Sequence, residues 1–544
     1  MTAVTSPPDL VFMGGAVFVP DRAAPATAVA VHKGRIVAVG DAEVADLAGV
    51  ATKVVDLAGG LLVPGFIDAH IHPVQGGLER MRCDLSELET KDAYRQAVRE
   101  YAEANPETPW ITGGGWSMTA FAGGTPRASD IDDVVADRPV FLPNRDHHGA
   151  WVNSRALALA GIDRHTPDPA DGRIELDAAG DPTGSLHEGA MALVGRLVPA
   201  DTAADRLAAL LEAQRHLHGV GITGWQDAIV GRYANIDDST DAYLGAADAG
   251  LLSARVVGAL WWERDQGLEQ LPRLAEQRAT ASRDRFRPTS VKIMQDGVVE
   301  NGTAGMLAHY LDASGVPTDN RGLSFVDPQQ LPTYVAALDE AGFQVHVHAI
   351  GDAAVRAALD AFAHARGVHG DRDRRHHIAH LQVIHPDDVP RFGALGVAAN
   401  MQPLWAVYDD QMTELTLPFL GPERSAQQYP FASLAAGGAV LAGGSDWPVS
   451  SPDPLLGIHA AVNRALPGES AHPFLPDQAL DVTTAVRAYT AGSAYLCHLD
   501  DAGQIDVGNL ADLVVLDRDI LAGPPQEIAD AHVMATYVGG VQVH

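Results

Sequence analysis

Two histidines one residue apart, His70 and His72, end an apolar run that begins at Leu61. Side chains alternate between the two faces of a β-strand, so positions i and i+2 point the same way. Neutral imidazole is a common ligand of Zn²⁺ and related ions. The pair is therefore a candidate half of a metal site, although two ordinary polar histidines at a strand end would show the same spacing.

Further side chains that can bind a metal lie near the ends of later strand-like segments. His348 lies near the end of FQVHVHAI, His380 lies in HHIAHLQ, and Asp446 lies in AVLAGGSDWP. Imidazole nitrogen and carboxylate oxygen are ligands that Zn²⁺ accepts. If these strands form one parallel barrel, their carboxyl ends meet at one mouth. The set then predicts a site for Zn²⁺ or a similar divalent ion.

Lysine is rare in this chain, which has 38 basic residues but lysine only at Lys33, Lys53, Lys91 and Lys292. Lys292 lies in the strand-like segment TSVKIMQDG, where burial is expected. A buried lone ammonium is costly, and arginine cannot replace lysine where amine chemistry is needed. The carbamate formed from an amine and CO₂ is a bidentate anion that can bridge two ions. A lysine at a strand edge that reaches solvent is the alternative.

The segments that carry these residues alternate with amphipathic helical stretches, the pattern of β/α units and a parallel sheet. We expect strands at RPVFLPN (138–144), GVGITGWQDA (219–228), LLSARVVGAL (251–260), TSVKIMQDG (289–297), FQVHVHAI (343–350), HHIAHLQ (376–382), GVAANMQP (396–403) and AVLAGGSDWP (439–448). About eight such strands suit an α/β fold of the (β/α)₈ TIM-barrel type, with its active site at the strands' C-terminal ends.

The two ends of the chain have a different pattern, with short runs of alternating Val, Ala and Ile separated by turn residues. This pattern is typical of antiparallel β-structure. We expect residues 1–63 and 497–544 to form one small β-sandwich domain, and residues 64–496 to form the barrel. Between about 75 and 215 the spacing is irregular and rich in Gly, Pro and Asp. This region is predicted to be an insertion or elaborated loops near the barrel mouth.

Net charge, hydropathy and cysteine content exclude several classes of protein. A net charge of −32 argues against nucleic acid or an anionic membrane as a partner. No apolar run is long enough for a membrane span, and the start MTAVTSPPDL lacks the pattern of a signal peptide. Cys83 and Cys497 are the only cysteines, so no disulfide framework is expected. These features favour a cytoplasmic enzyme.

Several longer segments together resemble the metal-dependent amidohydrolase superfamily, in particular its YtcJ-like branch, which includes N-substituted formamide deformylase. The matching segments are PGFIDAHIH, PVFLPNRDHHGAWVNSRAL, SVKIMQDGV, HVHAIGDAAV, IAHLQVI, GGSDWPV and ADLVVLD. The resemblance implies that the metal ligands are His70, His72, Lys292, His348, His380 and Asp446. It implies one or two divalent ions, most simply Zn²⁺, and a carbamate on Lys292 if there are two. It also implies a homodimer.

The implied reaction is hydrolysis of a C–N bond in a small amide or N-substituted formamide by a metal-activated hydroxide, which releases an amine and a carboxylic acid. Asp446 would take a proton from the water and return it to the leaving amine. His148, in NRDHHGAWVNS, is the candidate for the imidazole that faces the substrate carbonyl. Trp116, Trp405 and Glu188 are candidate substrate-binding residues, although the tryptophans suit packing and Glu188 suits a helix start.

Other histidines are expected to be structural. His346 is expected to point away from His348. His376 and His377 are expected to start a strand without binding metal, and Arg374 and Arg375 beside them suggest a surface turn.

Three alternatives to this reaction stay open. A deaminase of the same superfamily usually has His-x-x-Glu after the fifth strand, whereas His348 is followed here by Ala349-Ile350-Gly351. A cyclic-amide hydrolase of the same superfamily shares the fold, but its sequence motifs differ from those of this chain. A non-catalytic barrel scaffold would have lost a ligand, and all six are present.

Overall fold

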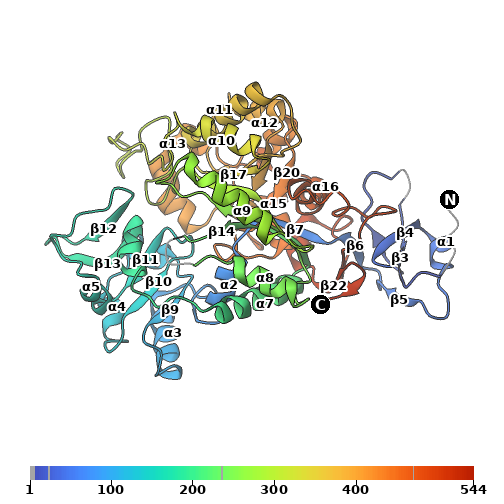
Figure 1. The fold of residues 1–544 in the computed structure, drawn as a ribbon, viewed down its shortest axis with the longest axis horizontal. Helices are drawn as coiled ribbons and strands as arrows, with labels where there is room; N and C mark the ends of the chain where they lie inside the picture. The colour runs from blue at the N-terminus through green and yellow to red at the C-terminus, as the bar shows by residue number, and fades with distance from the viewer. Residues whose placement is uncertain (1–6, 23–24, 234–236, 470) are drawn as a thin grey trace.

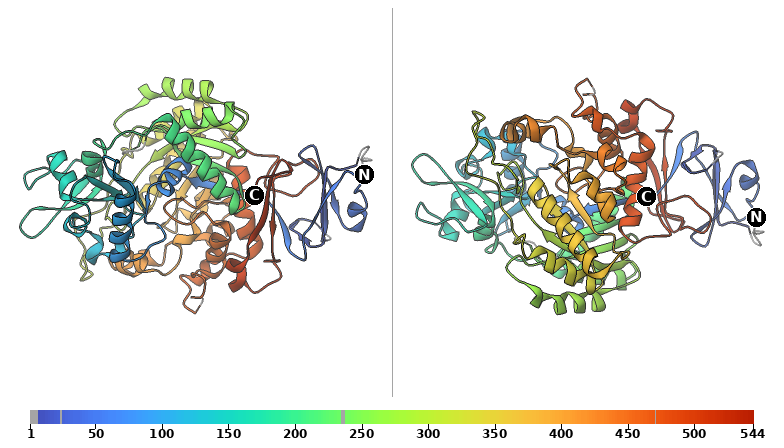
Figure 2. Two further views of the ribbon diagram at one scale, coloured as in Figure 1. Left: turned by 90° about the horizontal axis from the view of Figure 1, so that it is seen from below. Right: turned by 90° about the horizontal axis from the view of Figure 1, so that it is seen from above.

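The computed structural model describes residues 7–22, 25–233, 237–469 and 471–544, and it has three parts along its longest axis (Figure 1). A β-sandwich lies at one end, a barrel in the middle and an inserted sheet at the other end. Figure 2 shows the same order from two further directions. Residues 1–6, on which the expectation about a signal peptide partly depends, lie outside the described residues.

Eight parallel strands form the barrel, and each pairs with the next one along the chain. They are β7 (Phe66–Ile71), β14 (Ile222–Val230), β15 (Arg255–Trp261), β16 (Phe286–Met294), β17 (Gln344–Ala349), β18 (His377–His380), β19 (Ala398–Met401) and β20 (Leu441–Gly443). Most of their residues are buried on both faces, as expected for strands that helices cover on the outside. The predicted (β/α)₈ barrel is therefore confirmed.

Backbone hydrogen bonds just after β7 and β20 join the two ends of this sheet. The Asp446 N–H donates to the His70 carbonyl at 2.7 Å, and the His72 N–H donates to the Trp447 carbonyl at 2.8 Å. The first and last strands thus meet at their carboxyl ends, and the sheet becomes a barrel there.

Helices follow most of the barrel strands, and local sequence sets where they begin and end. The main ones are α7 (Ala203–Gly219), α8 (Thr240–Asp248), α9 (Leu271–Ala281), α10 (Leu331–Glu340), α11 (Asp352–His369), α12 (Val389–Leu395) and α14 (Phe431–Ala436). Thr202 and Asp205 form a capping box that satisfies backbone donors at the start of α7. Gly396 ends α12 in the left-handed conformation, at φ 68°. None of the described helices is long and apolar enough to cross a membrane.

Both ends of the chain contribute to the sandwich. One sheet has the order β4 (Arg35–Gly40), β3 (Ala28–His32), β1 (Leu10–Met13), β5 (Lys53–Asp56). The other has the order β2 (Ala16–Val17), β6 (Leu61–Pro64), β21 (Leu513–Leu516), β22 (Val533–Val538), β23 (Val541–Gln542). Their inner faces share one apolar core, in which the rings of Phe12 and Tyr537 meet edge to face at 5.1 Å.

The insertion folds as its own mixed sheet between β7 and β14. The strand order is β12 (Gly172–Leu176), β13 (Pro182–Glu188), β11 (Gly149–Val152), β10 (Val140–Pro143), β9 (Ile111–Gly114), β8 (Cys83–Asp84). The segment RPVFLPN, expected among the barrel strands, forms β10 here. That expectation was wrong because an apolar run of four to eight residues indicates a buried strand but not which sheet buries it.

Candidate metal centre and active site

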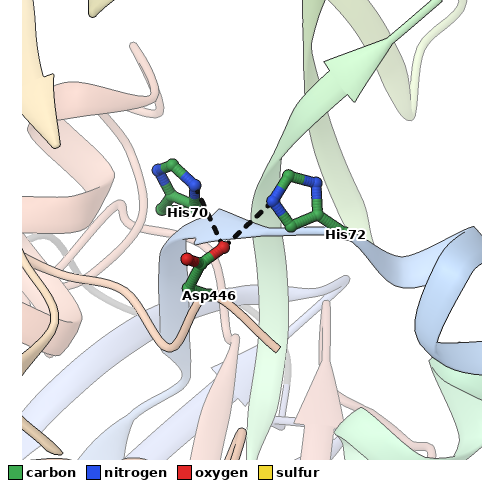
Figure 3. A group of neighbouring side chains, drawn as sticks. All are labelled: His70, His72 and Asp446. Carbon is green, nitrogen blue, oxygen red and sulfur yellow. Dashed lines mark ion pairs between the residues drawn. The ribbon is translucent and has the colours of Figure 1, made fainter. Parts of the chain in front are cut away.

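The carboxyl ends of the first and last barrel strands bring three potential metal ligands together (Figure 3). Asp446 Oδ1 lies 3.2 Å from His70 Nε2 and 3.0 Å from His72 Nε2. One nitrogen or oxygen atom from each residue lies within 4.8 Å of those from the other two. His70 and Asp446 are buried, and His72 is partly buried. Two imidazoles and one carboxylate therefore surround a space where a cation can bind.

Asp68 holds the two strands in this position. Its Oδ1 accepts hydrogen bonds from the backbone N–H groups of His70 and Ser445, both at 3.0 Å. Burial raises the pKa of the Asp68 carboxyl to about 7. Asp68 thus links the backbone of His70 to that of Ser445, the residue before Asp446. This role was not expected from the sequence, although an acidic residue inside the apolar run PGFIDAHIH is an observable signal.

His346 supports His70 from inside the barrel. Its Nε2 lies 2.9 Å from His70 Nδ1, and the two rings are 4.7 Å apart. This contact directs the other ring nitrogen of His70 toward Asp446. The expectation that His346 points away from His348 was wrong, because positions i and i+2 of a strand share one face. The same rule places His70 and His72 on one face.

The other expected ligands surround this group at greater distances. Lys292 Nζ, on β16, lies 3.4 Å from His70 Nε2, and His380 Nδ1 lies 3.9 Å from Asp446 Oδ2. The rings of His348 and His380 are 4.4 Å apart, and His348 Nε2 faces the Gly297 carbonyl at 3.4 Å. The structure therefore brings all six residues to one barrel mouth, with His70, His72 and Asp446 most closely grouped.

The electrostatics of the cluster favour neutral nitrogen ligands beside one carboxylate. Burial, followed by the charge of Lys292, lowers the pKa of His70 to about 3. Burial lowers the pKa of Lys292 to about 7. Burial favours the neutral form of Asp446, but His70 and His72 outweigh it and hold the pKa of that carboxyl well below its usual range. At neutral pH the Asp446 carboxylate is therefore ionised, and the His70 imidazole is neutral with a lone pair that can bind a metal ion.

These residues fit a divalent cation. Asp446 Oδ1 and His380 Nδ1 are buried and have no hydrogen-bond partner among the described residues. A buried polar atom left without a partner costs about 1–3 kcal/mol, and more when it is charged. A cation held by these atoms removes that cost, and the nitrogen and carboxylate donors match Zn²⁺ or a similar ion.

His148 and Glu188 form a buried pair beside the cluster. His148 Nδ1 lies 2.9 Å from Glu188 Oε1, and Thr303 Oγ1 donates to the same oxygen at 2.9 Å. Burial lowers the pKa of His148, but the charge and hydrogen bond of Glu188 outweigh it and raise that pKa to about 9. The His148 ring lies 6.0 Å from the His348 ring. A protonated imidazole therefore lies next to the expected metal ligands.

The two candidate substrate-binding tryptophans lie in different surroundings. Trp405 stacks on His380 with ring centroids 5.1 Å apart and an interplanar angle of 1°. Trp116 is buried in the core of the insertion, packs on Phe121 and Trp151, and donates to the Leu142 carbonyl at 2.7 Å. The ring and the N–H of Trp116 are therefore both used within this core, which favours packing, the alternative expected from the sequence, over substrate binding.

Further polar residues complete the support of the site. Gln402 Oε1 accepts from the His380 N–H at 2.8 Å, and Asn400 Nδ2 donates to the Ala69 carbonyl at 2.8 Å. His377 is fully buried, with its ring 4.2 Å from that of His346. The expected strand start is confirmed, since β18 begins at His377, but this histidine is buried and does not lie in a surface turn.

Comparisons with known proteins agree with this fold. Residues 53–544 match the model of the Amidohydrolase family, Amidohydro_3. Protein LONG AFTER FAR-RED 3 of Arabidopsis thaliana is 34% identical over 98% of this chain and 91% of its own length. Putative amidohydrolase YtcJ of Bacillus subtilis is 32% identical, over 91% and 90%. N-substituted formamide deformylase of Arthrobacter pascens is 27% identical, over 95% and 94%.

Solved structures show the same similarity. Uncharacterized metal-dependent hydrolases from Pyrococcus horikoshii and Pyrococcus furiosus superpose with TM-scores of 0.73 and 0.70, each at 25% identity. The alignments cover 95% and 94% of this chain and 99% of each of those chains. The chain belongs to the Amidohydrolase family, and it is a hydrolytic enzyme that acts on carbon–nitrogen bonds.

Proposed function

We propose that this enzyme hydrolyses the C–N bond of a small amide or N-substituted formamide, with Zn²⁺ or a similar divalent ion held by His70, His72 and Asp446. The observation that carries the proposal is the buried carboxylate oxygen of Asp446 facing two imidazole nitrogens at 3.0 and 3.2 Å. The relatives named for amide and formamide chemistry support the choice of substrate.

A bound divalent ion lowers the pKa of a water molecule and polarises a carbonyl group. Asp446 is the general base: it accepts a proton from the attacking water and returns it to the leaving nitrogen, so that one amide and one water give an acid and an amine. Its low pKa keeps the carboxylate ionised and able to accept that proton at neutral pH.

Lys292 and His148 have separate roles in this proposal. The lowered pKa of Lys292 leaves a large share of the amine uncharged near pH 7, the form that adds CO₂ to give a carbamate and a proton. A carbamate here would provide a bridging anion for a second ion. His148, protonated through its pairing with Glu188, donates a hydrogen bond to the oxygen of the scissile carbonyl.

The test combines metal analysis with a substrate panel. Protein purified without chelators is analysed for metal per chain and then assayed with N-substituted formamides, N-acyl amines and cyclic amides, with released amine and acid both measured. We expect equal amounts of amine and acid from at least one open-chain amide or formamide. A metal-containing protein that releases amine from none of the three classes would contradict the proposal.

Three variants sharpen this test. Asp446→Asn removes the proposed base, whereas Asp248→Asn makes the same change at an exposed carboxylate on the outer helix α8. Metal content in Lys292→Ala distinguishes a two-ion site from a one-ion site. A fall from about two ions to one or none supports a carbamate bridge, and an unchanged single ion assigns Lys292 to another role.

A further inference from the structure

Arg264 is a cation at the barrel mouth that lacks a full set of acceptors. It follows the end of β15 by three residues, and its side chain is 18% exposed. Its Nη2 lies 2.8 Å from Met294 Sδ and 3.5 Å from the Tyr233 hydroxyl, and its Nε is buried without a hydrogen-bond partner among the described residues. Thioether sulfur is a weak acceptor. Most of the five guanidinium donors therefore have no strong partner among the residues that the structure describes.

The nearest carboxylate pairs only weakly with this guanidinium. Asp171 Oδ2 lies 3.9 Å from Nη1, and the Asp171 side chain is half exposed. An ion pair of this kind contributes little. Elsewhere in the chain Arg164 makes two hydrogen bonds from Nη2 to Asp181, at 2.6 and 2.7 Å, and a third from Nε. A bidentate partner of that kind is what Arg264 lacks.

Aromatic rings hold the guanidinium in place. Its carbon lies 3.8 Å from the centroid of the Phe325 ring, 5.7 Å from that of Tyr233 and 5.9 Å from that of Trp261. Cation–π contacts stabilise arginine without using its N–H donors. The planar donor edge is thus fixed in orientation and still able to bind an anion in a bidentate manner.

This guanidinium belongs to the same mouth as the expected metal ligands. Met294, which it contacts, pairs with His348 in the β16–β17 register and follows Lys292 by two residues. A pocket beside His72 extends past Asp227 and Ile229 to Tyr233, whose hydroxyl faces Arg264. The charge of Arg264 also acts on His148 and Glu188, although their pairing with each other has the larger effect on the pKa of both.

We propose that Arg264 is a specificity residue that binds a carboxylate of the substrate. This inference rests on the proposed function, and it narrows the substrate to an amide or formamide whose other end has a carboxylate, such as an N-acyl or N-formyl amino acid. The carboxylate accepts two hydrogen bonds from the planar edge of Arg264, while the scissile bond lies near His70, His72 and Asp446. In a chain with a net charge of −32, a positive group fixed in the mouth offsets the general repulsion of an anion.

The first experiment compares two substrates that differ only in the carboxylate, N-formylphenylalanine and N-formylphenethylamine. We expect the wild-type enzyme to prefer the former by tenfold or more in kcat/KM. Arg264→Gln should remove that preference and leave the neutral substrate within about twofold, whereas Arg273→Gln, on the outer helix α9, should keep it. Equal loss for both substrates in Arg264→Gln, or an unchanged preference, would overturn the inference.

A second experiment needs no turnover and so separates this inference from the proposed reaction. Binding of phenylacetate and of 2-phenylethanol is measured by thermal shift in the purified metalloprotein. We expect the acid to bind the wild type better than the alcohol, and the difference to fall at least fivefold in Arg264→Gln. A carboxylate bound at the metal would still bind the variant, so an undiminished difference would overturn the role of Arg264, whatever the substrate panel shows.

Discussion

Arg255 and Arg264 flank the same barrel strand, β15, and their surroundings are opposite. Arg255, at the start of the strand, makes two hydrogen bonds to Asp512, at 2.5 and 2.9 Å, where the barrel meets the sandwich. Arg264, just after the end of the strand, has one weak sulfur acceptor and a distant Asp171. Along this strand, the arginine at the N-terminal end is fully paired and suits a stabilising role, whereas the arginine at the C-terminal end has no strong acceptor among the described residues.

The largest effect is expected from Asp446→Asn, which removes a negative charge at the mouth of the barrel, just after the C-terminal end of β20. Turnover should fall roughly 10³-fold or more, because the variant lacks both the proton acceptor and an anionic ligand. The unfolding temperature of the metalloprotein should also fall, because the variant lacks a ligand that holds the stabilising ion. Parallel assays of released amine and thermal unfolding measure the two effects. Retained turnover would show that Asp446 is not the base.

Asp512→Ala tests the other end of the strand. It leaves Arg255 largely buried without its partner and should lower the free energy of unfolding by about 3 kcal/mol. Activity per folded molecule should stay unchanged, because the pair lies away from the mouth. Denaturant unfolding and an assay at low temperature separate the two readouts. The double variant Arg255→Met/Asp512→Leu should recover most of the stability, and a failure to recover would point to lost packing instead.

The pH dependence tests the buried pair at the mouth. The folded-state pKa of His148, about 9, lies above its ordinary value of 6.5, so its contribution to stability is complete below pH 6.5 and is lost as the pH rises through about 9. Activity that needs the protonated imidazole should fall over the same alkaline range. Glu188→Gln should move this fall to lower pH. A pH–rate profile with the same alkaline limb in both proteins would exclude His148 as its source.

The smallest effect is expected from Trp116→Phe in the core of the insertion. The variant loses the hydrogen bond to the Leu142 carbonyl and some packing, which should cost about 1–2 kcal/mol of stability. KM and kcat should not change, because the ring does not reach the pocket. Trp405→Phe is the matched comparison, since Trp405 stacks on His380. A changed KM in Trp116→Phe would restore a substrate-binding role for this residue.

The sequence predicted the barrel, and it predicted that the candidate metal ligands would lie at one mouth, for one physical reason. In a parallel barrel the carboxyl ends of all strands lie on one side, so residues at strand ends converge even when the shapes of the loops between them cannot be predicted. His70, His348 and Asp446 could therefore be assigned to one mouth from their positions along the chain. Family resemblance then added the expected ligand set.

The errors have physical reasons too. The partners of RPVFLPN depend on which sheet this segment joins, and a local apolar pattern does not encode that choice. The orientation of His346 was predicted wrongly because the alternation of side chains was misapplied, although the sequence contained the information needed. Arg264 could not be distinguished from the other arginines, because its significance lies in the acceptors it lacks, and this appears only when its neighbours are placed in space.

The hydrogen bonds of Asp68 also have a consequence for the order in which the protein matures. One of these hydrogen bonds joins Asp68 to Ser445, and these two residues are 377 positions apart in the chain. During synthesis the segment around His70 emerges long before the one around Asp446, so the complete ligand group cannot form until nearly the whole barrel has been made. Metal loading should therefore be a late step, and a chain truncated before β20 should be unable to hold the ion however well its earlier strands fold.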